Sequence, residues 1–141
     1  VSLGGTVRTM KRETMTLIEQ GMKRVVAGVA SGLGATAEVD FRLIFAPLVN
    51  DKTATAEIAD AAAELVGDSN VNRNRPPASA SEDFSFMLEK VPGAYINLGN
   101  GEASAPVHNH LYNFNDEAIP FGSALMARII ERKLQRDPGK A

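Results

Sequence analysis

The two histidines of the chain, His108 and His110, lie together in one loop-like stretch, APVHNHLYNFNDEAIPFG, at residues 105–122. A neutral imidazole nitrogen is a good metal ligand near pH 7. On an extended segment the two rings of an H-x-H pair point to the same side, so the pair could chelate one ion. The alternative is that both are loop histidines satisfied by hydrogen bonds or water. On spacing alone, this second interpretation is favoured.

Neighbouring carboxylates offer a second kind of chemistry. Glu82 and Asp83 could be a catalytic pair, and so could Asp116 and Glu117. Acids at the start of a helix are also favoured by the helix dipole alone, and that interpretation is the better one for both pairs. Arg8 lies on the polar side of a strand-like segment, where it could hold a substrate carboxylate, although such arginines are commonly solvated.

Composition excludes several classes of function. The 141 residues carry 15 basic and 17 acidic side chains, so no basic excess points to nucleic acid or an anionic membrane. No apolar run reaches the ~20 residues of a membrane-spanning helix. Cysteine is absent, which excludes disulfides and thiol chemistry. The G-x-G at 99–101 is isolated and predicts a turn. With no signal peptide evident, we expect a cytoplasmic protein without nucleic-acid or membrane partners.

The first third of the chain predicts a strand, a helix and a strand. Residues 1–9 and 35–45 alternate apolar and polar side chains, and residues 13–33 repeat apolar side chains at helical spacing, with a helix stop at 33–35. Because buried parallel strands are usually continuous apolar runs, the alternation favours an antiparallel α+β arrangement.

The remainder predicts helices, one short strand and loops. A helix is expected over 53–66, capped by Asp51 or Thr53, and a short one in SEDFSFMLEKV, capped by Ser81. AYINL, at 94–98, predicts a strand, and a loop follows over 99–113. The last helix is expected at about 117–135, with Pro120 near its first turn and a buried apolar face. Neither half looks complete, so we expect a piece of something longer.

Several stretches in this order resemble the C-terminal part of the M20 metallopeptidase family. They are VSLGGTVRT, PLVND, SEDFSFMLEKVPGAYINLGNG and APVHN followed by FNDEAIPFG, and they extend over nearly the whole chain. The resemblance is to the hippurate hydrolase / N-acyl-amino-acid amidohydrolase branch, which includes the plant auxin-conjugate hydrolases. It implies an α+β lid piece, the strand–helix–strand of an antiparallel sheet, at 1–46. The C-terminal part of an α/β metallohydrolase catalytic domain follows at 47–141.

The same resemblance implies a chemistry. Members hydrolyse the amide between an acyl group and an amino acid with two divalent ions, whether zinc, manganese, nickel or cobalt. The last metal ligand of the family falls on His108, whereas His110 stands where relatives commonly carry proline. Glu82, Asn109 and Arg8 are expected near the metals or the substrate without binding the ions. Ser79 and Asn113 depart from the usual methionine and aspartate.

No catalytic residue is expected in this chain, because the family's other ligands and its general base lie in segments before residue 1. The expected partners are an N-acyl amino acid, that missing N-terminal part, and a second copy of the chain in a homo-oligomer. Two alternatives stay open: a dipeptidase or a deacylase of the same family, and a non-enzymatic binding or assembly module that uses an exposed sheet edge at 1–46.

Overall fold

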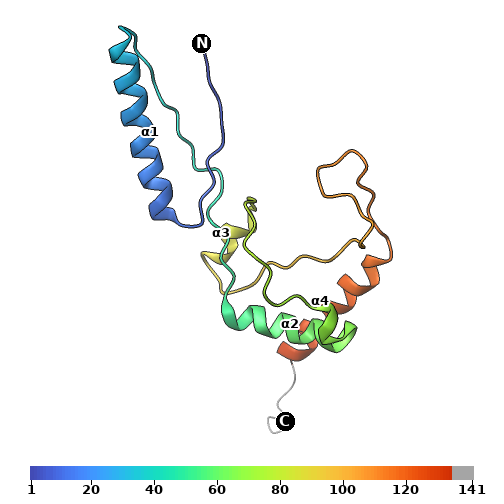
Figure 1. The fold of residues 1–141 in the computed structure, drawn as a ribbon. Helices are drawn as coiled ribbons and strands as arrows, with labels where there is room; N and C mark the ends of the chain where they lie inside the picture. Colours follow the sequence, from blue (N-terminus) through green and yellow to red (C-terminus); the bar gives the residue numbers. More distant parts are fainter. Residues whose placement is uncertain (135–141) are drawn as a thin grey trace. The chain divides into compact units, whose positions relative to one another are not determined.

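The computed structural model describes residues 1–134, and within that range the regular elements are helical (Figure 1). The described chain divides into two compact units. Unit 1 comprises Val1–Val49 and Pro76–Pro92, and unit 2 comprises Asn50–Arg75 and, among the described residues, 93–134. The elements are α1 (Arg12–Gly32), α2 (Lys52–Val66), the 3₁₀ turn η1 (Asp68–Asn70), α3 (Phe84–Leu88) and α4 (Ala118–Lys133).

Helix α1 confirms the helix predicted over 13–33 and ends where the sequence indicates. Gly34 takes the left-handed conformation, with φ 68°, directly after the C-cap residue Leu33. The backbone N–H of Ala35 donates to the carbonyl of Ala30 at 2.8 Å, and that of Gly34 donates to Ser31 at 3.0 Å. This pair of bonds is a Schellman motif, which satisfies the last carbonyls of the helix.

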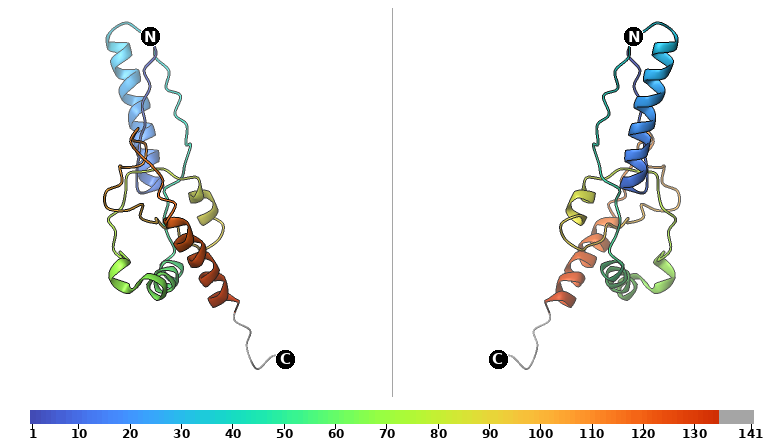
Figure 2. Two further views of the ribbon diagram at one scale, coloured as in Figure 1. Left: turned by 90° about the vertical axis from the view of Figure 1, so that its right-hand side faces the viewer. Right: turned by 90° about the vertical axis from the view of Figure 1, so that its left-hand side faces the viewer.

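The strands predicted on either side of α1 are wrong. Residues 1–9 and 35–45 run beside α1 in Figure 1 and in both views of Figure 2, but no backbone hydrogen bond joins the two segments. Within 35–45, Arg42 Nε donates to Asp40 Oδ1 at 3.0 Å, as extended backbone allows for residues two apart. That hydrogen bond lowers the pKa of the Asp40 carboxyl. Alternation thus predicted the side-chain pattern but not a partner strand.

The predicted fold class must therefore be corrected for residues 1–134. Neither an antiparallel α+β lid nor an α/β sheet is present there, and AYINL at 94–98 is likewise not a strand. A strand requires a neighbouring backbone for its N–H and C=O groups. In 94–98 the side chain of Asn50 fills that role: its Nδ2 donates to the Tyr95 carbonyl and its Oδ1 accepts from the Tyr95 N–H, both at 2.9 Å.

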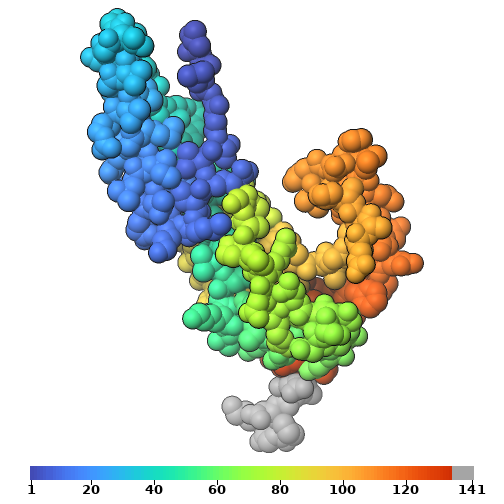
Figure 3. Space-filling model, viewed as in Figure 1, coloured from blue at the N-terminus to red at the C-terminus, as the bar shows by residue number. Residues whose placement is uncertain are grey.

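The apolar face of α1 is left uncovered in unit 1. None of its residues is buried, and Val25 and Val29 are 58% and 59% exposed. The space-filling view shows this helix with its side chains at the surface (Figure 3). None of the helices in residues 1–134 combines the length and apolar content needed to cross a membrane.

The short helix α3 is present as predicted, but its predicted cap is wrong. Asp83 occupies the N-cap position in place of Ser81, and no side chain caps this end. Because Asp83 already has helical backbone angles, φ −69° and ψ −23°, it does not adopt the extended geometry of a capping side chain.

Unit 2 is organised by the packing of α2 on α4. Ala61 of α2 is fully buried and Leu125 of α4 is 6% exposed. Asp51, one of the two predicted caps, caps α2: its Oδ1 accepts from the Ala54 N–H at 2.8 Å. Pro120 lies in the first turn of α4, where a missing N–H breaks no helical bond. The predicted extension of this helix to residue 135 lies outside the described residues.

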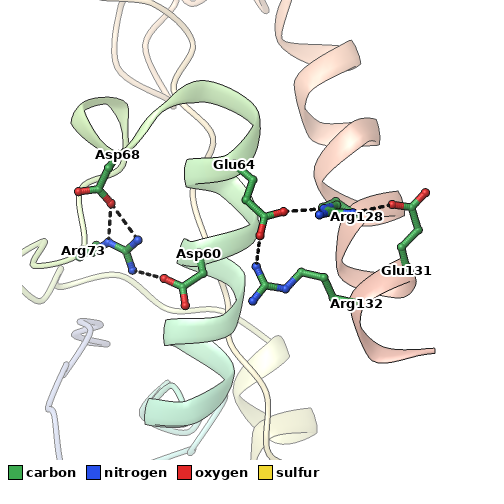
Figure 4. Close-up of polar contacts among 7 residues, drawn as sticks. All are labelled: Asp60, Glu64, Asp68, Arg73, Arg128, Glu131 and Arg132. Atoms are coloured by element: carbon green, nitrogen blue, oxygen red, sulfur yellow. Dashed lines mark hydrogen bonds and ion pairs between the residues drawn. The ribbon is translucent and has the colours of Figure 1, made fainter. Parts of the chain in front are cut away.

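Ion pairs reinforce this packing (Figure 4). Glu64 of α2 accepts from Arg128 Nε at 2.6 Å and from Arg132 Nη1 at 2.7 Å, so one carboxylate ties two turns of α4. The hydrogen bond that Arg128 donates to Glu64, followed by the one it donates to Glu131, raises the pKa of Arg128. On the other side of α2, Arg73 donates to Asp60 at 2.8 Å and to Asp68 at 2.9 Å.

We predict that Glu64→Gln lowers the urea midpoint of unfolding more than Glu131→Gln does. Glu64 pairs with two arginines across the α2–α4 contact, whereas Glu131 pairs with Arg128 within α4 at 3.2 Å. Circular dichroism during urea titration measures both variants. In about 1 M salt the difference should shrink, since the Debye length falls to roughly 3 Å. Equal midpoints at low salt would contradict this role for Glu64.

Candidate functional site

The candidate site is the loop of residues 101–114, which extends away from α2 and α4 within unit 2 (orange in Figures 1 and 3). Three successive turns shape it. Ser104 N donates to Gly101 O at 3.2 Å, Asn109 N to Pro106 O at 3.2 Å, and Tyr112 N to Asn109 O at 2.9 Å. The loop therefore has a defined path without helix or strand.

His108 holds an unusual backbone conformation in the middle turn. Its φ is 65°, and it is the one non-glycine residue with positive φ among residues 1–134. It is the third residue of the turn Pro106–Asn109, the position that type II turns normally give to glycine or asparagine. The left-handed region costs an L-residue about 1–2 kcal/mol. Such strain gathers at functional sites, where the surroundings impose it.

The imidazole of His108 is available for a ligand. The residue is exposed, and within the described chain its ring makes no hydrogen bond or ion pair. His110 is also exposed, but its backbone has no such strain. The two histidines of the H-x-H pair are thus both exposed, and they differ in backbone conformation.

Asn109 serves the loop itself. Its Oδ1 accepts from the Leu111 N–H at 2.9 Å, and its backbone N–H and carbonyl close the turns on either side. The predicted position of Asn109 beside the metal or substrate is untested, but its side chain has a clear structural task. Asn115 does the same before α4, where its Oδ1 accepts from the Glu117 N–H at 3.1 Å.

Asn100 joins the two ends of the loop and was missed from sequence. Its Nδ2 donates to the Asn113 carbonyl at 2.8 Å and to Ser104 Oγ at 2.7 Å. Its Oδ1 accepts from the Asn115 N–H at 2.7 Å. The sequence signal was an Asn-Gly dipeptide, which indicates a turn but not which distant backbone groups the amide will meet.

The other predicted residues lie in unit 1. Arg8 is exposed on the segment 1–9, and Glu82 is half-buried just before α3. His108 and Asn109 belong to unit 2. The four predicted residues therefore fall in two different units: His108 and Asn109 share unit 2, and Arg8 and Glu82 share unit 1.

The donor set in residues 1–134 does not complete a metal site. No group of three His, Cys, Asp or Glu side chains there could hold one ion. A catalytic metal needs about three protein ligands and an open position. His108 fits as one donor, since its ring is exposed and free of other bonds.

A comparison with protein families settles the ancestry of the chain. The model for peptidase family M20/M25/M40 matches residues 5–132. The chain belongs to this family. It is 31% identical over 125 residues, 89% of the chain, to an N-acetylcysteine deacetylase from Bacillus subtilis (strain 168). It is 28% identical over 130 residues, 92% of the chain, to a hippurate hydrolase from Campylobacter jejuni.

A third relative is an N-acetyldiaminopimelate deacetylase from Pediococcus pentosaceus, 28% identical over 134 residues and 94% of the chain. The matched regions cover 32%, 34% and 34% of the deacetylase from B. subtilis, the hippurate hydrolase and the P. pentosaceus protein, respectively. The chain thus spans about a third of the length of the curated relatives it matches. The resemblance to family M20 seen in the motifs is confirmed.

We predict that His108→Gly stabilises the loop by about 1 kcal/mol, because glycine relieves the left-handed strain and loses part of that gain to its greater unfolded-state freedom. His110→Gly is the matched control. With no strain to relieve, it should cost roughly 0.5–1 kcal/mol. Thermal unfolding of the two variants measures the contrast. A His108→Gly variant that is less stable than the parent would show that residue 108 carries no strain.

Proposed function

We propose that the chain is part of a metal-dependent M20 hydrolase that cleaves the amide bond of N-acyl amino acids, with His108 as a metal ligand. Membership of the family supports the hydrolase class. The names of relatives support the substrate class, since they are deacetylases of N-acetylcysteine and N-acetyldiaminopimelate and a hydrolase of hippurate.

The observation that carries the proposal is the conformation of His108. A residue with φ 65° at a turn position suited to glycine is retained at an energetic cost. What histidine offers there, and glycine does not, is an imidazole that is exposed and free of protein partners. A metal ligand is the role that explains both the strain and the unused ring nitrogen.

M20 enzymes generally depend on divalent metals. When bound, a divalent ion polarises an amide carbonyl and makes water more acidic. In that chemistry His108 supplies one neutral nitrogen, and the turns on either side hold its backbone in place. We propose that the complete enzyme binds two such ions, each of them zinc, manganese, nickel or cobalt.

Further assignments accompany this proposal, and the place of Glu82 near the site rests on the family resemblance. Glu82, Asn109 and Arg8 lie near the metals or the substrate, and Arg8 is the group suited to a substrate carboxylate. Residues 1–46, without the sheet expected from the sequence, are proposed as the C-terminal half of a lid or dimerisation domain, and residues 47–141 as the C-terminal part of the catalytic domain. A homo-oligomer stays a prediction, and the uncovered apolar face of α1 agrees with a covering partner.

The second candidate is a dipeptidase of the same family. Full-length protein assayed on benzoyl-glycine, N-acetyl amino acids and free dipeptides would separate the two. Turnover of the acylated substrates with none on dipeptides supports the amidohydrolase, and the reverse result replaces it. Absence of turnover on all three classes favours a binding or assembly module.

We predict that His108→Ala in the full-length enzyme lowers turnover of an N-acyl amino acid by at least roughly 100-fold. Loss of a residue that merely supports a ligand already costs about 10–100-fold. His110→Ala is the control, and it should retain nearly all activity, because the family resemblance assigns no metal ligand to position 110. Near-normal turnover by His108→Ala removes His108 from the site.

We also predict that the 141-residue chain alone hydrolyses no N-acyl amino acid above background. Catalysis needs a metal held by about three protein ligands. No group of three potential ligands lies close together in residues 1–134. Added zinc or manganese should not rescue it, whereas the full-length protein should be active in the same assay with benzoyl-glycine. Turnover by the isolated chain with metal present would overturn the assignment of the missing ligands.

A further inference from the structure

The side chain of Asn100 takes the place of a neighbouring strand along residues 113–115. In extended backbone, the carbonyl before a residue and the N–H after it point to the same side. Asn113 O and Asn115 N flank Phe114 in this way, and the Asn100 amide donates to the first at 2.8 Å and accepts from the second at 2.7 Å. One planar group thus makes the pair of bonds that a strand would make.

These bonds are the ties between the two ends of the loop. The other hydrogen bonds of residues 101–114 are local turns, such as Ser104 to Gly101 and Tyr112 to Asn109. Nδ2 of Asn100 also donates to Ser104 Oγ at 2.7 Å, which in turn donates to the Ala105 carbonyl at 3.0 Å. Asn100 therefore binds both the start of the loop, at Ser104, and its end, at residues 113 and 115.

Residues 113–115 also border an apolar groove of unit 2. Phe114 lines a groove of about 570 Å³ in unit 2, together with Leu98, Ile119 and Leu125. Leu125 of α4 is 6% exposed. Phe114 itself is 51% exposed, so the hydrogen bonds of Asn100 are what hold this short segment.

We propose that Asn100 is the positioning residue for His108. A strained turn persists when its surroundings leave no alternative, and a loop whose ends are tied has fewer conformations than a free one. Tying residue 100 to residues 113 and 115 thereby holds the turn in which His108 sits. This proposal rests on His108 being a metal ligand, and it assigns to Asn100 no contact with metal or substrate.

The test compares Asn100→Ala with Asn113→Ala in the full-length protein. Asn113 accepts the Asn100 hydrogen bond through its backbone carbonyl, and alanine keeps that group. Asn100→Ala should speed hydrogen exchange at the Asn115 amide and weaken zinc binding by roughly 10–100-fold, the usual cost of losing support for a ligand. Asn113→Ala should change zinc affinity by less than about twofold on the same reasoning.

Unchanged zinc affinity in Asn100→Ala overturns the proposal, even if the Asn115 amide exchanges faster. An equal loss in Asn113→Ala also overturns it, because the effect would then belong to the loop in general. Should Asn100→Ala fail to fold, Asn100→Asp is the second variant: it keeps the acceptor for Asn115 and loses the donor for Asn113. Its zinc affinity should fall, and full affinity would again overturn the proposal.

His108→Ala separates this proposal from the function on which it rests. If that variant keeps full zinc affinity, the metal role of His108 is wrong, and with it the proposed function. If His108→Ala loses zinc affinity while Asn100→Ala does not, the function stands and the positioning role falls. Loss in both, with normal binding in Asn113→Ala, is the result expected.

Discussion

The contact between α2 and α4 is the interaction on which unit 2 depends. Ala61 of α2 and Leu125 of α4 are buried, and Glu64 joins the two helices by binding Arg128 and Arg132 together. The C-terminal end of the candidate loop leads into α4, which begins at Ala118. The extended residues 94–98 and 113–115 are then fastened by asparagine amides, from Asn50 and Asn100, where other proteins would use a sheet.

The helices were predictable because their signals are local. Apolar spacing, the cap at Asp51 and the glycine stop at Gly34 act within a few residues, and each is found where it was expected. The strands were not, because alternation describes one segment while a sheet needs two. Sequence also does not show what covers the apolar side of a helix, because the covering residues come from elsewhere. Helix α1 has the predicted apolar stripe, yet Val25 and Val29 are exposed.

The candidate site shows the same division. Motif resemblance led to His108, and family membership then followed from the match to residues 5–132. The left-handed backbone at His108 could not be foreseen, because histidine is not a residue that usually marks such a turn. Asn100 was invisible for a related reason. Its partners at residues 113 and 115 are chosen by the path of the chain, and sequence spacing carries no record of that path.

The hydrogen bonds of the Asn100 side chain also affect its deamidation. Asn100 precedes Gly101. Because Gly101 has no side chain, its backbone nitrogen is unusually free to attack the side-chain amide of Asn100, which leads to aspartate and isoaspartate. Here both ends of that amide are held by hydrogen bonds. Folding should thus slow this deamidation, and peptide mapping of stored folded and unfolded protein would reveal the difference. Once formed, the carboxylate would face the Asn113 carbonyl, acceptor against acceptor, and the loop would open at its base.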